Sequence, residues 1–149
     1  MHTGLPFTVY TGASFKGGGD YNADGYQYDV PNAPSFGNHL PGQPRSAFLK
    51  GLFPASAFPK PALGQEGDLG RNTFDAPGYA NTNLNVAKLF YTPFFRGERL
   101  NLEFRGEFFN LFNHPNLLTM DSNLTDSNFG RATAQQTARN IQLHLKAEF

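Results

Sequence analysis

The chain closes on Ile141-Gln142-Leu143-His144-Leu145-Lys146-Ala147-Glu148-Phe149, the stretch that decides its fold class. Apolar and polar residues alternate through it without interruption, which is the period of a β-strand. Because successive side chains of a strand point to opposite faces, the odd-numbered residues share an apolar face and the even-numbered residues share a polar face. The alternation predicts a strand over residues 138–149.

Three further segments are predicted to be strands. In residues 99–113 the apolar positions are Leu102, Phe104, Gly106 and Phe108, and the polar positions are Glu103, Arg105 and Glu107. In residues 82–94, Leu84, Val86 and Phe90 are in phase, and Lys88 breaks the phase. Either Lys88 extends along the apolar surface or a β-bulge rotates the register there. A shorter strand is predicted over residues 5–12.

The composition agrees with an all-β chain. There are 16 Phe, 6 Tyr, 16 Gly and 11 Pro among 149 residues, and aromatic residues favour strands whereas Gly and Pro mark turns. The 12 basic residues balance the 12 acidic ones, so no net field would attract nucleic acid, and we expect no nucleic-acid partner. The absence of Cys excludes disulfides and cysteine nucleophiles.

The connections between the predicted strands alternate in length. A long loop over residues 13–81 is followed by a short turn near residues 95–98 and then by a second long loop over residues 114–137. Outer-membrane β-barrels have short periplasmic turns and long extracellular loops. We therefore expect an antiparallel sheet that forms the last four or so strands of a transmembrane barrel in the bacterial outer membrane, with both long loops outside the cell and Phe149 at the periplasmic end.

Four strands cannot close a barrel. Open strand edges in lipid would leave backbone groups unpaired at several kcal/mol each, so the sheet needs partner strands that these residues do not supply. The opening residues Met1 to Pro6 contain no basic stretch followed by an apolar one, so they do not form a signal peptide. We expect a signal peptide, the remaining strands and a plug upstream in a longer chain.

Several motifs resemble the closing region of TonB-dependent receptors of the Oar-like type. They are Pro6–Tyr10, Asp24-Gly25 with Asp29 and Pro31, Gly70–Phe74, Pro77-Gly78, Asn83–Phe90, Phe104–Asn116, Asn128–Arg131 and Arg139–Leu143. The segment Phe104–Asn116 is similar to the family's phrase ending in FNLFNHPN. The resemblance covers nearly the whole chain in the right order.

The resemblance implies a large barrel with an N-terminal plug and uptake of an external substrate powered through TonB. The implied partners are the remaining strands and plug of the same receptor, TonB through the absent N-terminal part, and outer-membrane lipid. The terminal aromatic residue, with apolar residues at alternating positions before it, looks like the signal read by the barrel assembly machinery. That signal would consist of Ile141, Leu143, Leu145, Ala147 and Phe149.

The polar positions of two strands are predicted to face the barrel lumen. They are Glu103, Arg105, Glu107, Gln142, His144 and Lys146. The pattern of acids on one strand could suggest acid and base catalysis, but a polar lumen explains charged rows better because the charges stay solvated. No HExxH, GxSxG or P-loop motif occurs, so we expect no enzyme.

One loop has oxygen-bearing side chains at alternating positions. Asp20, Asn22, Asp24 and Asp29, with Gly25 at the sixth position, follow the start of a calcium-binding loop, and they make Ca2+ the candidate cofactor. Pro31 stands where that loop would carry its bidentate Glu, and a turn-rich loop without metal is the alternative. A second overall hypothesis follows, a soluble or surface β-sandwich that binds through this loop.

Overall fold

A computed structural model describes residues 2–12, 19–37, 42–93 and 99–149. The chain divides into two compact units. Ala80–Pro115 and Thr137–Phe149 form the first, which we call the sheet unit. His2–Tyr79 and Asn116–Gln136 form the second, which we call the loop unit. None of the helices in the described ranges is long and apolar enough to cross a membrane.

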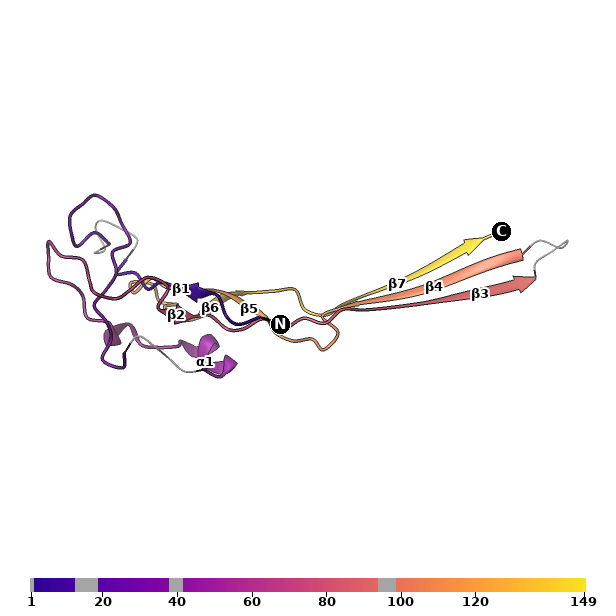
Figure 1. Cartoon of the computed structure of the whole chain (residues 1–149), viewed down its shortest axis with the longest axis horizontal. Helices are drawn as coiled ribbons and strands as arrows, with labels where there is room; N and C mark the ends of the chain where they lie inside the picture. Colours follow the sequence, from indigo (N-terminus) through magenta and orange to yellow (C-terminus); the bar gives the residue numbers. More distant parts are fainter. Residues whose placement is uncertain (1, 13–18, 38–41, 94–98) are drawn as a thin grey trace. The chain divides into compact units, whose positions relative to one another are not determined.

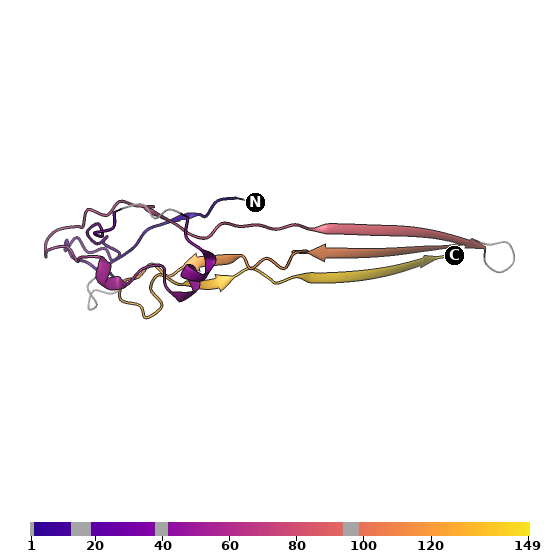
Figure 2. The same ribbon diagram turned by 90° about the horizontal axis from the view of Figure 1, so that it is seen from below.

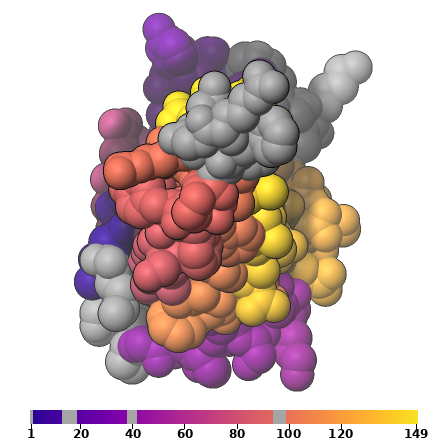
Figure 3. Space-filling model, turned by 90° about the vertical axis from the view of Figure 1, so that its right-hand side faces the viewer, coloured from indigo at the N-terminus to yellow at the C-terminus, as the bar shows by residue number. Residues whose placement is uncertain are grey.

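The sheet unit is a three-stranded antiparallel sheet in the order β3-β4-β7. Its strands are β3 (Leu84–Pro93), β4 (Arg99–Phe109) and β7 (Asn140–Glu148). They lie side by side in both ribbon views and in the space-filling view (Figures 1, 2 and 3). These strands fall inside the ranges 82–94, 99–113 and 138–149 that the alternation predicts.

The strand register sorts the side chains into two faces, because residues directly opposite each other share a face. The apolar face carries the rows Leu84–Phe108–Ile141, Val86–Gly106–Leu143, Lys88–Phe104–Leu145 and Phe90–Leu102–Ala147. The polar face carries the rows Asn85–Glu107–Gln142, Ala87–Arg105–His144, Leu89–Glu103–Lys146 and Tyr91–Asn101–Glu148. The two faces are thus chemically distinct on β4 and β7, whereas β3 contributes Ala87, Leu89 and Tyr91 to the polar face.

The register also decides between the two interpretations of Lys88. Pairing between β3 and β4 continues one residue at a time from Leu84 to Pro93, so no bulge interrupts it. Lys88 therefore lies on the apolar face, and its Nζ lies 5.9 Å from the centre of the Phe90 ring. The aliphatic part of a lysine side chain can lie along such a surface while its ammonium group makes a cation–π contact with an aromatic ring.

The apolar face is exposed to an unusual degree. Phe90 is 51% exposed, Leu143 65% and Leu145 72%. A contiguous apolar surface of this kind marks contact with a membrane or with another protein. The sheet unit therefore does not bury its apolar side chains as a soluble domain would.

The loop unit has its own hydrophobic core. It contains two short antiparallel pairs, β1 (Pro6–Phe7) with β2 (Phe74–Asp75) and β5 (Leu117–Met120) with β6 (Ala132–Gln135). A helix, α1 (Arg45–Lys50), and a 3-10 turn, η1 (Ala55–Ala57), complete it. The main core cluster consists of Val9, Val30, Phe53, Phe58, Leu69, Phe74, Leu124 and Phe129. Ring centres within this cluster approach as closely as 4.9 Å, between Phe53 and Phe74.

The structure differs from the sequence expectation in two respects. The strand expected over residues 5–12 is only β1, and it pairs with β2 instead of joining the long sheet, which has three strands among the described residues. The expected loops 13–81 and 114–137 supply most of a packed core. The reason is that this core is built from single aromatic and aliphatic residues at irregular spacing, which no periodic pattern reveals.

Close backbone approaches tighten the loop unit. At Gly67, a Cβ atom would lie 2.2 Å from the carbonyl carbon of Pro31, so only glycine allows this contact. At Gly130 the backbone has a φ of 73° and its carbonyl accepts a hydrogen bond from Leu52 N–H at 2.7 Å. Segments that are distant in the sequence are held together in this way.

Candidate functional site

The polar face of the sheet unit brings the predicted lumen residues together. Arg105 of β4 lies between two acids of its own strand, with Nη2 2.8 Å from Glu103 Oε1 and Nη1 4.0 Å from Glu107 Oε1. On β7, His144 Nε2 lies 3.9 Å from Glu107 Oε2, and Lys146 Nζ lies 2.5 Å from Glu148 Oε1. A surface hollow of about 440 Å³ is lined by Glu103, Arg105, Glu107, Gln142, His144, Leu145 and Lys146.

These ion pairs remain hydrated. The Arg105 side chain is 46% exposed and that of Glu103 is 25% exposed. Exposed ion pairs contribute at most about 1 kcal/mol each, so stability alone does not explain the row. The arrangement is a solvated surface on which acids and bases alternate and neutralise one another.

Four of the five residues of the predicted assembly signal lie on β7, and the fifth, Phe149, follows directly after it. Ile141, Leu143, Leu145 and Ala147 lie on the apolar face of the sheet. Phe149 follows in the same phase and is 87% exposed. Because β7 is the outer strand of the sheet, one of its edges has no partner among the described strands.

Asn110 joins the three long strands at one end of the sheet. Its N–H donates to Asn83 Oδ1 before β3, and its Nδ2 donates to the carbonyl oxygens of His114 and Thr137. Its Oδ1 accepts the N–H of His114 at 2.9 Å. Asn110 is 5% exposed and has a φ of 54°, a left-handed conformation that asparagine tolerates better than most residues.

Asn113 extends this cluster, since its Oδ1 accepts the N–H of Arg139 at 3.1 Å, just before β7. Asn110 and Asn113 both belong to the segment Phe104–Asn116 that resembles the receptor phrase. Their structural role was not predicted from the sequence, although two asparagines that follow an alternating strand are a signal for left-handed turn positions. We call Asn110 and Asn113 the asparagine node.

The acidic loop of the loop unit brings three of its four predicted ligands close together. Carboxylate oxygens of Asp20, Asp24 and Asp29 all lie within 4.8 Å of one another. Asn22 lies beside them, with its Nδ2 3.1 Å from Asp24 Oδ2. The buried Asp29 accepts the N–H groups of Tyr21 and Asn22 through Oδ2.

The other oxygens of this loop are also hydrogen-bonded. Asp20 accepts the N–H groups of Asp24 and Gly25, each at 3.2 Å, and Asp24 accepts that of Tyr26 at 2.8 Å. These bonds give the loop a defined conformation by themselves, as in any turn rich in Asp and Asn. Calcium binding by Asp20, Asn22, Asp24 and Asp29 stays a prediction.

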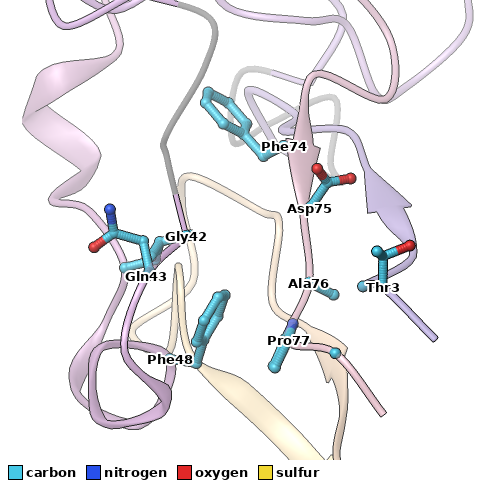
Figure 4. A pocket seen from close by; sticks show the side chains of 11 residues that line it. Thr3, Gly42, Gln43, Phe48, Phe74, Asp75, Ala76 and Pro77 are labelled. Atoms are coloured by element: carbon cyan, nitrogen blue, oxygen red, sulfur yellow. The ribbon is translucent and has the colours of Figure 1, made fainter. Parts of the chain in front are cut away.

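Two cavities of the loop unit are lined mainly by backbone and apolar groups. One, of about 300 Å³, lies between the α1 segment and β2, with Gln43 and Phe48 on one side and Phe74 to Pro77 on the other (Figure 4). Asp75 is the single carboxylate among the described residues that line it. The other, of about 610 Å³, is lined by Phe7, Pro77, Tyr79, Leu117 and Met120, among others.

A further cavity of about 350 Å³ was not foreseen from the sequence. Its lining residues are Thr8, Tyr10, Gln27, Tyr28, Val30, Glu66, Arg71 and Asn72. They come from three separate segments of the loop unit, so no local spacing connects them. The only sequence signal near this cavity is that Tyr28 precedes Asp29 of the acidic loop.

Comparison with known proteins gives one match. The family model for an outer membrane beta barrel domain matches residues 1–142 of the chain. Neither the curated proteins nor the solved structures contain a significant match.

Proposed function

The chain belongs to the outer membrane beta barrel domain family, and from this premise we propose that it is the C-terminal barrel segment of a TonB-dependent receptor. The membership makes it a β-barrel protein of the bacterial outer membrane. The proposal adds that the complete receptor takes up an external substrate, that the polar face lines its lumen, and that the two long connections lie outside the cell.

The observation that carries this proposal is the asparagine node. The phrase that resembles TonB-dependent receptors, Phe104–Asn116, contains the second half of the two-faced strand β4 and the asparagines that tie it to the segments before β3 and β7. The residues that carry the resemblance therefore have a defined structural role. The partners that we propose are the plug and remaining strands of the receptor, TonB, the barrel assembly machinery and outer-membrane lipid.

The geometry favours this proposal over a soluble β-sandwich. A sandwich would cover the apolar face with a second sheet. Here Ile141, Leu143 and Leu145 are each at least half exposed, as a lipid-facing surface requires. The edges of β3 and β7 that have no partner among the described strands are also the places where barrel neighbours would pair.

We also propose that the chain has no catalytic activity. The acids of the polar face are close to Arg105 and His144, but they form a hydrated row instead of a desolvated pair with separate roles.

The direct test uses the full-length protein in its own outer membrane. A photo-reactive amino acid placed before the plug in the sequence should cross-link to TonB in living cells. The yield of the cross-linked product should increase when the cells grow in a medium that contains the substrate. A protein that reaches the outer membrane, never cross-links to TonB and conducts ions as a permanently open pore in planar bilayers would refute the receptor assignment while leaving the barrel family intact.

A further inference from the structure

The cavity of about 350 Å³ in the loop unit has the features of a ligand site. We call it the tyrosine pocket, and its lining residues are Thr8, Tyr10, Gln27, Tyr28, Val30, Glu66, Arg71 and Asn72. Its volume lies at the lower end of the range of small-molecule sites, about 300 to 1,000 Å³. Gln27 and Tyr28 belong to the acidic loop but are not among its predicted calcium ligands, and no pocket residue is one of the six predicted lumen residues or part of the asparagine node.

The floor of the pocket is rigid. Val30 and Thr8 are buried, and Thr8 Oγ1 accepts the N–H of Asn72 at 2.8 Å. Tyr10 is held through its backbone, since its N–H donates to Ser122 O and its carbonyl accepts the N–H of Leu124, both at 2.9 Å. A preorganised floor lowers the entropy cost of binding a ligand.

Two tyrosine rings form the aromatic part of the pocket. The rings of Tyr10 and Tyr28 meet edge to face, with centres 5.4 Å apart. Tyr28 has a φ of 79°, which is rare for a large side chain. The next residue, Asp29, holds this conformation, because its carbonyl accepts both the N–H and the hydroxyl of Thr11, at 2.8 and 3.0 Å.

The rim of the pocket is polar and has both kinds of hydrogen-bonding group. Arg71 only donates, an ionised Glu66 only accepts, and Gln27 and Asn72 do both. No ion pair joins Glu66 to Arg71 in the described part of the chain, so both charges are available to a ligand. An anion would be repelled by Glu66 and a cation by Arg71.

We propose that the tyrosine pocket binds an uncharged, hydroxyl-rich ligand, which means a short stretch of glycan. A sugar hydroxyl both donates and accepts, so neighbouring hydroxyls can satisfy Arg71 and Glu66 at the same time. The apolar C–H face of a sugar ring fits against an exposed tyrosine ring such as that of Tyr28, which is 56% exposed. Access to the pocket from the medium rests on the proposed topology, whereas the binding itself does not.

The experiment applies the full-length protein, purified from outer membranes in detergent, to an array of plant, fungal and bacterial oligosaccharides. We expect binding to a saccharide group, measured again in solution by calorimetry. Tyr28→Ala should weaken the affinity for the saccharide by about tenfold or more, and Arg71→Met should also weaken this affinity. Tyr28→Phe should retain most of it, because the ring remains.

Tyr26→Ala is the matched control. Tyr26 lies in the same loop, is 76% exposed and does not line the pocket, so its loss should leave affinity unchanged. The variants must keep the circular dichroism spectrum and detergent-gel mobility of the parent. Arg71→Met, an exposed change, provides an informative variant if Tyr28→Ala fails to fold.

Absence of any saccharide binding at millimolar concentration would overturn the proposal. So would binding that Tyr28→Ala and Arg71→Met both leave unchanged, or a preference for zwitterionic peptides over every saccharide. These outcomes leave the TonB cross-link unaffected, so failure of this inference is distinguishable from failure of the receptor assignment.

Discussion

At the scale of single residues, position on a face decides what a side chain must do. Lys88 is the charged residue of the apolar face, in the third of its four rows, beside Phe90 on its own strand and opposite Phe104 on β4. Asn110 is a buried polar residue whose donors and acceptor all have partners. The charge of Lys88 lowers the stability of the protein if the apolar face meets lipid. Removal of the Asn110 side chain also lowers stability, because its hydrogen-bond partners are left unpaired.

Replacing Lys88 by Leu should stabilise the protein. A lysine on the lipid face of a barrel costs up to about 2–4 kcal/mol at the bilayer midplane, so its removal should raise the free energy of unfolding by a part of that amount. Denaturant titration of the full-length protein in lipid vesicles measures this change. Lys146→Leu, on the polar face, is the matched control and should give no comparable gain. A loss of stability in Lys88→Leu would mean that a partner neutralises the lysine.

Replacing Asn110 by Ala should destabilise the sheet. The change leaves the N–H of His114 and the carbonyl of Thr137 without their partner, at a cost of about 1–3 kcal/mol. The same titration measures it. Asn85→Ala is the control, because the side-chain hydrogen bond of Asn85 among the described residues is exposed and long, 3.4 Å to Glu107. Equal effects of the two substitutions would show that the asparagine node does not hold the strands.

The calcium hypothesis is also decided by individual residues. The full-length protein should bind Ca2+ weakly, in the millimolar range, and the double variant Asp20→Asn with Asp24→Asn should lose this binding because two charged oxygen ligands are removed. Calorimetry provides the measurement, with Asp126→Asn as a control outside the loop. No heat of binding in the parent protein would show that the loop is an ordinary turn.

At the scale of elements, the long strands were predictable and the loop unit was not. Alternation is a local property, so residues 82–94, 99–113 and 138–149 contain β3, β4 and β7. The loop core depends on single residues such as Phe53 and Phe129, which meet only after the chain has folded. The six residues predicted to face the lumen share one face of the sheet because they share a strand period, whereas the tyrosine pocket draws on separate segments and has no such signal.

The terminal strand β7 allows a test of assembly. Phe149→Ala should lower the amount of folded protein in the outer membrane several-fold, because the exposed aromatic residue at the end of the apolar row is lost. Heat-modifiable mobility on gels, compared with total protein, measures the folded fraction. Glu148→Ala is the matched control on the opposite face and should assemble normally. If both variants reached parental levels, the terminal row would not be an assembly signal.

At the scale of the whole molecule, the family membership and the two-faced sheet have one physical explanation. An exposed apolar face is unstable in water but is the required outer surface of a barrel in a bilayer. The hydrated row of Glu103, Arg105 and Lys146 on the other face suits a water-filled interior. The sequence alone predicted this division, since it depends on which residues alternate and not on how the loops pack.

Spin labels placed one at a time along residues 141–148 of the full-length protein in its membrane report which face of β7 meets lipid. We expect high accessibility to oxygen and low accessibility to a water-soluble nickel reagent at Ile141, Leu143, Leu145 and Ala147, and the reverse at Gln142, His144 and Lys146. The same low accessibility to oxygen at every position, or an alternation of the opposite phase, would contradict it.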